Sequence, residues 1–131
     1  MIVLDASAAV AVLLNLGENA RLIWNRIAEE DGEVHVPHLF EIEVVSALRR
    51  HTVRRESSER SVELIEDLMS MRLTRYPHTA LLRRIWELRN NITAYDAAYV
   101  ALAETLDVPL ITLDAKLARA SEIHAAVELY K

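Results

Sequence analysis

Short apolar runs alternate along the chain with longer stretches whose apolar residues recur every three to four positions. Five short runs predict strands: residues 2–4, 34–36, 73–76, 108–113 and, at the edge of the sheet, 126–129. The longer stretches predict helices: residues 6–15, 18–31, 39–54, 79–90, 93–106 and 114–120, with another helix starting at Ser58. This alternation is typical of an α/β fold with a central, mostly parallel sheet covered by helices on both faces.

Length and composition fit one domain spanning residues 1–131. The chain is 52% hydrophobic, has no low-complexity stretch and has only two glycines, of which Gly17 is expected to stop the first helix. It has no cysteine, which excludes disulfides and thiolate metal sites. No signal segment or membrane-spanning run is recognisable, so we expect a soluble, cytoplasmic protein without a membrane partner.

The net charge of −5 is unevenly distributed. Residues 46–89 hold ten bases and six acids, whereas the segments on either side are acidic. Thirteen of the fifteen bases are arginine, a residue suited to bidentate contacts with phosphate or carboxylate. The basic run that includes Arg49, Arg50, Arg54 and Arg55 predicts a solvated helix end, with RNA or partner contact as the second interpretation.

Two aspartates follow predicted strands directly. Asp5 comes after the strand at residues 2–4, and Asp114 comes after the strand at residues 108–113. Because ligands of parallel sheets bind beyond the carboxyl ends of the strands, both aspartates lie where an active site is expected. A buried carboxylate also needs a partner, because burying an unpaired charge is costly.

Two further acids join them as candidates. Asp96 lies in the first turn of the helix that TAYDAAYVALA begins, and Glu43 lies at the margin of an apolar helix face. Glu41 lies at the opposite margin of that face, so periodicity does not choose between the two glutamates. Carboxylates without cysteines indicate a hard cation, Mg²⁺ or Mn²⁺, which would relieve repulsion among the acids and support hydrolysis of phosphodiester bonds.

Each aspartate also has a purely structural interpretation. Asp5 and Asp114 precede helices, where aspartate is a favoured N-cap. Thr93 and Asp96 have the spacing of a capping box. Capping does not exclude a functional role, because a helix N-terminus also stabilises negative charge.

Other kinds of site find little support. Ser7 lacks the glycine elbow of a serine hydrolase, and His35 and His38 have a spacing that suits no metal pair. Gly17 and Gly32 form no phosphate-binding loop, which argues against P-loop and dinucleotide-binding domains.

Four ordered motifs resemble the PIN-domain ribonucleases, in particular the VapC toxins of bacterial toxin–antitoxin pairs. IVLDASAAVAVLL resembles the first strand, with its aspartate and a small residue two positions later, here Ser7. PHLFEIEVVSALRR resembles the Pro-then-Glu helix, which favours Glu43 over Glu41. TAYDAAYVALAE and VPLITLDAKLARA resemble the third and fourth acidic motifs. The match extends from residue 2 to about residue 120.

The resemblance implies a three-layer α/β/α sandwich and a metal-dependent endoribonuclease that is homodimeric and inhibited by an antitoxin. Asp5, Glu43, Asp96 and Asp114 would hold one or two Mg²⁺ or Mn²⁺ ions. Ser7 and Thr112 would orient these ligands or a water by hydrogen bonds. Lys116 stands where some members of the family have an additional acid.

Two alternatives stay open from the sequence. A catalytically silent relative would bind RNA or protein only, although its acids would then have no chemical task. A phospho-receiver domain shares the parallel α/β fold but needs an acid pair near the first strand, where Asp5 stands alone.

Overall fold

The computed structural model describes residues 1–52 and 58–131. Its sheet has the strand order β3-β2-β1-β4-β5, and every neighbouring pair of strands is parallel. The strands are β1 (Val3–Leu4), β2 (Glu33–Pro37), β3 (Arg72–Tyr76), β4 (Leu110–Thr112) and β5 (Val127–Leu129). The parallel sheet predicted from the sequence is therefore confirmed.

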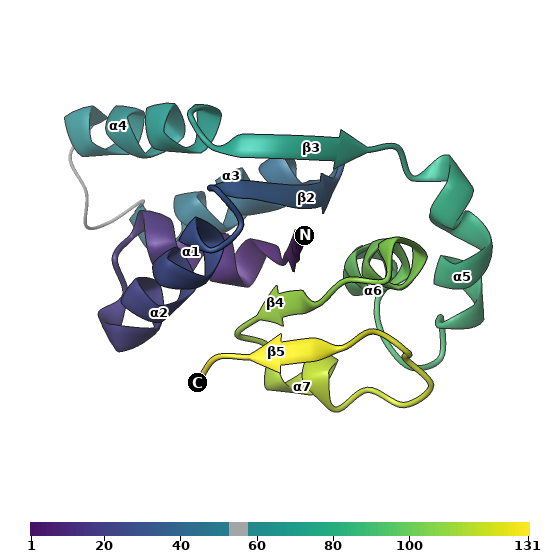
Figure 1. Ribbon diagram of the computed structural model, residues 1–131. Helices are drawn as coiled ribbons and strands as arrows, with labels where there is room; N and C mark the ends of the chain where they lie inside the picture. The colour runs from purple at the N-terminus through teal and green to yellow at the C-terminus, as the bar shows by residue number, and fades with distance from the viewer. Residues whose placement is uncertain (53–57) are drawn as a thin grey trace.

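Helices connect successive strands (Figure 1). They are α1 (Ala6–Leu13), α2 (Gly17–Ala28), α3 (Phe40–Thr52), α4 (Ser58–Met69), the 3₁₀ turn η1 (Thr79–Leu81), α5 (Leu82–Glu87), α6 (Ala94–Leu106) and α7 (Ala115–Ala118). Within residues 1–52 and 58–131, no helix combines the length and the apolar character that a membrane span requires.

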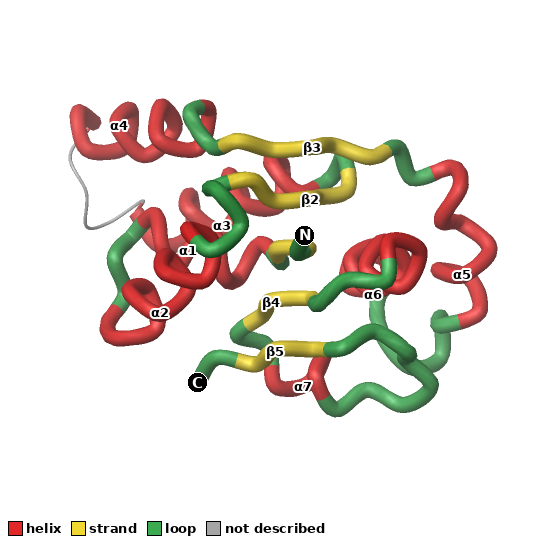
Figure 2. The backbone as a smooth tube through the Cα atoms, viewed as in Figure 1, coloured by secondary structure: helices red, strands yellow, loops and turns green. Residues whose placement is uncertain are grey.

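The strand order reverses at β1. From β1 the chain moves outward to β2 and β3 through α1–α4, then returns through α5 and α6 to β4 on the other side of β1 and continues through α7 to β5. Since crossover connections are right-handed, α1–α4 cover one face of the sheet and α5–α7 cover the other. In Figure 2, α1 and α2 lie to the left of the strands, and α5 and α6 lie to the right. This is the predicted α/β/α sandwich.

The core forms where the central strands meet the helices. Ile2, Val3 and Leu4 are fully buried, as are Leu110 and Ile111 of the neighbouring strand. Residues 97–103 of α6 are all buried, and many of them are alanines, which allow the helix backbone to approach the strands closely. These central elements give the carboxyl ends of β1 and β4 a rigid support.

Some helix ends differ from the predicted ones. Helix α1 ends at Leu13, and Asn15 takes a left-handed φ of 53° that an α-helix does not accommodate. Gly17 does not stop this helix; it begins α2 with φ 69°, a value that glycine adopts without strain. The helix expected over residues 79–90 begins as a 3₁₀ turn, in which the Leu81 N–H bonds to the His78 carbonyl at 2.8 Å.

Candidate active site

Asp5 is the most buried acid of the site, with 6% of its surface exposed. Its N–H bonds to the Ile111 carbonyl at 2.9 Å, which holds it beside the end of β4. Its Oδ2 accepts hydrogen bonds from the Ser7 hydroxyl at 2.8 Å and the Thr112 hydroxyl at 2.7 Å. The side chain makes no capping bond to α1, although Asp5 occupies the N-cap position. The predicted cap is therefore wrong, because the carboxylate is engaged by the two hydroxyls instead.

Ser7 and Thr112 connect Asp5 to the loop after β4. The Ser7 oxygen accepts the Leu113 N–H at 3.1 Å, and the Thr112 oxygen accepts the Asp114 N–H at 3.0 Å. Each hydroxyl thus accepts a backbone proton and directs its own proton to Asp5. This arrangement fixes the orientation of the Asp5 carboxylate. The role expected for Ser7 and Thr112 in a metal site stays a prediction.

Asp114 caps α7, as its position predicted. Its Oδ1 accepts the Lys116 N–H at 2.8 Å and the Leu117 N–H at 3.3 Å. Both capping bonds fall on Oδ1, so capping leaves Oδ2 available for another role. Lys116 itself is exposed.

Glu43 reaches the site from α3, on the opposite face of the sheet from α6. Its Oε1 accepts a hydrogen bond of 2.6 Å from the Tyr99 hydroxyl of α6. Glu41 instead binds Arg75 of β3, with contacts of 2.7 and 3.1 Å. The structure thus places Glu43, and not Glu41, beside the other acids.

Tyr99 is a site residue that the sequence reasoning missed. Burial and the Glu43 carboxylate raise the pKa of Tyr99 far above its usual range, so that its hydroxyl stays protonated and acts as a donor. The available signal was its position three residues after Asp96, since residues at this spacing lie on neighbouring parts of one helix face.

Asp96 stands in the first turn of α6. The Thr93 hydroxyl accepts the Asp96 N–H at 3.2 Å, so Thr93 caps the helix as the motif predicted. The helix ends at Leu106, and its C-cap residue Asp107 adopts the left-handed conformation with φ 54°. The cap fixes the start of α6 and therefore the position from which the Asp96 carboxylate extends.

The acids influence one another electrostatically. Burial raises the pKa of Asp5 above its usual value; the two hydroxyls oppose this shift, and Asp114 adds to it. Burial also raises the pKa of Glu43, against the Tyr99 hydrogen bond, and the charges of Asp5 and Asp96 raise it further. For Asp96, burial raises the pKa first, followed by the charges of Asp5 and Asp114. Four carboxylates thus share one electrostatic environment at the carboxyl ends of β1 and β4.

This donor set suits a hard divalent cation. Carboxylate oxygens are the ligands that Mg²⁺ and Mn²⁺ prefer, and a cation would relieve the repulsion that adds to the effect of burial on the pKa values. Within the described residues, no group of three or more His, Asp or Glu side chains is arranged to hold a metal ion. By their chemistry alone the donors fit Mg²⁺ or Mn²⁺, and Mg²⁺ commonly keeps several water ligands.

Only part of the basic run predicted to contact solvent or RNA lies within the described residues. Arg49 and Arg50 are exposed in the last turn of α3. The positive charge of Arg50 acts on Glu43 and lowers its pKa, which opposes the effect of the neighbouring acids. Arg54 and Arg55 lie outside the described residues.

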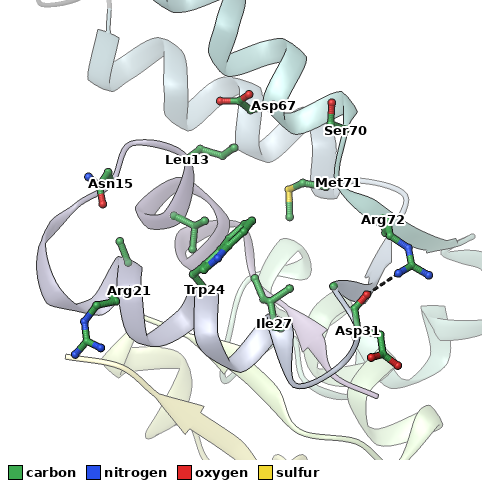
Figure 3. A pocket seen from close by; sticks show the side chains of 14 residues that line it. Leu13, Asn15, Arg21, Trp24, Ile27, Asp31, Asp67, Ser70, Met71 and Arg72 are labelled. Carbon is green, nitrogen blue, oxygen red and sulfur yellow. Dashed lines mark hydrogen bonds between the residues drawn. The ribbon is translucent and has the colours of Figure 1, made fainter.

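A large apolar hollow of about 970 Å³ lies away from these acids (Figure 3). Trp24 and Ile27 of α2 line it, together with Leu13 of α1 and Met71 before β3. Its margin includes Arg72, the first residue of β3, so the hollow lies at the amino ends of the strands. None of the four candidate acids belongs to it.

Comparisons with known proteins agree with this fold. Residues 2–123 match the PIN domain family. The chain is 47% identical to the ribonuclease VapC9 of Mycobacterium tuberculosis over 118 residues, which cover 89% of this chain and 88% of VapC9. It is 39% identical to the ribonuclease VapC1 of the same organism over 131 residues, or 98% of this chain and 97% of VapC1.

A solved structure shows the same fold. VapBC2 from Rickettsia felis, crystallised with a DNA fragment from its promoter, superimposes with a TM-score of 0.71 over the full length of both chains. Sequence identity to that chain is 15%, so this similarity concerns the fold alone.

Proposed function

Because the chain belongs to the PIN-domain family and, within it, to the VapC ribonucleases, we propose that it is an endoribonuclease toxin that hydrolyses RNA phosphodiester bonds and is inhibited by a cognate antitoxin. The relatives at 47% and 39% identity are named ribonucleases, and they align with most or all of the chain. Structural neighbours with the same fold include VapBC toxin–antitoxin complexes.

The observation that carries this proposal is the electrostatic coupling of four carboxylates at the reversal of strand order. Asp5, Glu43, Asp96 and Asp114 come from separate elements on both faces of the sheet, and the pKa values of Asp5, Glu43 and Asp96 are raised. A bound Mg²⁺ or Mn²⁺ ion supplies charge neutralisation at the phosphate and lowers the pKa of a water. Together these acids would hold one or two such ions.

The other residues of the site orient these ligands. Ser7 and Thr112 hold Asp5 through its Oδ2, which leaves Oδ1 for a metal or a water. Tyr99 holds Glu43 through Oε1 in the same way. The N-termini of α6 and α7 offset part of the negative charge of Asp96 and Asp114.

The partners follow from the same assignment. Arg49 and Arg50 offer RNA the positive charge that the acidic site lacks. Large apolar side chains, including Ile42 of α3 and Trp86 of α5, stay exposed, as an interface within a homodimer requires.

We further propose that the protein acts in the cytoplasm and that residues 1–131 form one domain.

An RNA cleavage assay tests the proposal. Protein freed of copurified antitoxin is incubated with total cellular RNA and Mg²⁺ or Mn²⁺, beside Asp5→Asn and Asp96→Asn variants purified in the same way. Asp67→Asn, an exposed acid of α4, is the matched control. We expect discrete RNA fragments from the wild type and the control, and none from the two site variants or in EDTA.

The outcome separates the alternatives. Cleavage that persists in EDTA and in both site variants contradicts the metal-dependent mechanism. RNA binding without cleavage under every metal condition favours the catalytically silent module.

A further inference from the structure

Tyr95 is an exposed aromatic residue next to a candidate metal ligand. It lies in the first turn of α6, one residue before Asp96, and 64% of its surface is exposed. Side chains of a helix lean toward its N-terminus, so the ring extends over the end of α6 at which Asp96 stands. Tyr95 therefore offers an exposed aromatic surface at the same helix end as Asp96.

The Tyr95 ring lies on the same face of α6 as residues that are buried in the core, but Tyr95 itself is exposed to solvent. Tyr95, Tyr99 and Leu102 follow one another at helical spacing and share one side of the helix. Tyr99 and Leu102 are buried, and the Tyr99 hydroxyl contacts Glu43 at 2.6 Å. Tyr95 therefore stands one turn above the Glu43 contact, at the solvent-facing margin of the site.

Charge limits what can bind beside the acids. A phosphate group placed near Asp5, Glu43 and Asp96 is repelled by the negative charges of these carboxylates when they are ionised. The π-face of a nucleobase carries no net charge, and stacking on an aromatic ring contributes binding free energy without this penalty. Only bases that are not paired in a helix expose this face.

We propose that Tyr95 stacks on a nucleobase of single-stranded RNA beside the scissile phosphate and so contributes to the choice of cleavage site. The proposal rests on the ribonuclease function above and specifies how its substrate is held.

Arg50 provides a second contact of a different kind. It lies seven residues after Glu43, two turns along the same side of α3, and its charge is felt at Glu43. Arg50 would contact an RNA phosphate away from the acids, while Tyr95 stacks a base near them. The two contacts differ in their response to salt, because phosphate contacts release counterions and stacking does not.

The test measures binding of a 12-nucleotide single-stranded RNA that contains 2-aminopurine, in the Asp96→Asn background so that the RNA stays intact. Fluorescence anisotropy gives the Kd at two salt concentrations, and the 2-aminopurine emission reports stacking. The second substitutions are Tyr95→Ala, Tyr95→Phe, Tyr95→Leu and Arg50→Ala. Trp24→Ala, an aromatic residue 62% exposed in the remote hollow, is the control.

We expect Tyr95→Ala and Tyr95→Leu to weaken binding roughly tenfold at both salt concentrations, the scale of one base–aromatic stack. Tyr95→Phe and Trp24→Ala should stay within about twofold, because they keep the ring at position 95. Quenching of 2-aminopurine should be lost only with Ala or Leu at position 95. Arg50→Ala should instead reduce the salt dependence of log Kd by roughly one unit of slope.

Unchanged binding and quenching in Tyr95→Ala overturn the stacking proposal, whereas the cleavage assay with wild-type protein still decides the ribonuclease function. If Tyr95→Ala changes the sedimentation coefficient of the protein but not its RNA binding, Tyr95 contacts a second protein chain instead. That result also overturns the stacking proposal. Failure of the wild type to bind any RNA overturns both. Thermal melting of each variant confirms that α6 stays folded.

Discussion

Thr112 donates a hydrogen bond of 2.7 Å to Asp5 across 107 residues of sequence. The bond joins the carboxyl ends of β1 and β4, the two strands between which the sheet reverses its order. Thr112 is fully buried and also accepts the Asp114 N–H. One hydroxyl therefore sets the position of two candidate metal ligands.

Thr112→Val removes this hydroxyl while keeping the shape of the side chain. Asp5 then loses one of its two donors, and the Asp114 N–H loses its acceptor. Substitution of residues that orient metal ligands typically costs about 10- to 100-fold in metal affinity or activity. We expect a loss of this size in Mn²⁺ affinity, measured by calorimetric titration, and in RNA cleavage.

Thr112→Ser serves as the control because it keeps the hydroxyl. We expect Thr112→Ser to retain most of the metal affinity, apart from a small loss of stability. Equal losses in both variants would assign the effect to packing of the missing methyl group rather than to the hydrogen bond.

Tyr99→Phe tests the corresponding support of Glu43. The change removes only the hydroxyl that donates to Glu43 at 2.6 Å. Without this donor the pKa of Glu43 rises further, because the bond stabilises its ionised form. We expect the affinity for Mn²⁺ to fall about tenfold and cleavage to fall with it, in the same titration.

Tyr76→Phe is the matched control for this loss of a hydroxyl. The Tyr76 hydroxyl makes a hydrogen bond of 2.7 Å with His35 Nδ1, between β3 and β2 and apart from the acids. Its removal should lower the free energy of unfolding by about 1 kcal/mol without changing metal affinity. A weaker metal site in Tyr76→Phe would point to a general loosening of the fold.

The sequence was sufficient to place the aspartates because their position depends on local rules. Asp5 and Asp114 each follow a short apolar strand, and parallel strands bring their carboxyl ends to the same edge of the sheet. The caps at Thr93 and Asp114 are equally local, since each needs only amides of the next helical turn.

The parts that sequence periodicity did not resolve depend on distant partners. Glu41 and Glu43 lie at equivalent margins of α3, and their roles differ because Arg75 binds one and Tyr99 binds the other. Asp5 did not form its expected cap because Ser7 and Thr112 engage its carboxylate, and Thr112 becomes a neighbour only through the pairing of β1 with β4. Hydrogen-bond partners that are distant in sequence can be identified only from the three-dimensional structure.

Asp5→Asn should separate stability from activity. Burial makes the ionised form of Asp5 unfavourable, whereas asparagine has the same shape and no charge. In EDTA we expect Asp5→Asn to be more stable than the wild type by about 1 kcal/mol, or roughly 3–5 °C in Tm, by differential scanning calorimetry.

Addition of Mg²⁺ should reverse this order. Saturating Mg²⁺ raises the Tm of the wild type, since a ligand at 100 times its Kd contributes about 2.7 kcal/mol. Asp5→Asn should gain little, and Asp67→Asn on α4 should behave like the wild type in both buffers. An Asp5→Asn protein that Mg²⁺ stabilises as much as the wild type would remove Asp5 from the metal site.

The Glu104–Arg84 pair predicts how stability depends on pH. Arg84 of α5 binds Glu104 of α6 with contacts of 2.8 and 3.0 Å, and the His124 N–H donates to the same carboxylate at 3.0 Å. Burial alone would raise the pKa of Glu104, but these donors outweigh it and hold the pKa below the ordinary value of 4.5. The folded state therefore binds the Glu104 proton less tightly than the unfolded chain does.

A carboxylate with a lowered pKa stabilises the fold above its unfolded pKa, and this contribution is lost as pH falls through the folded pKa. We expect Glu104→Gln to lose about 1 kcal/mol of unfolding free energy at pH 7, and the difference from the wild type to shrink as pH falls below the ordinary glutamate pKa of 4.5, in urea titrations. Glu87→Gln removes an exposed carboxylate that contacts the same arginine at 3.1 Å, and it should change stability little at any pH. A constant difference between Glu104→Gln and the wild type from pH 7 to pH 3 would show that the ionised pair contributes nothing beyond the packing of its side chains.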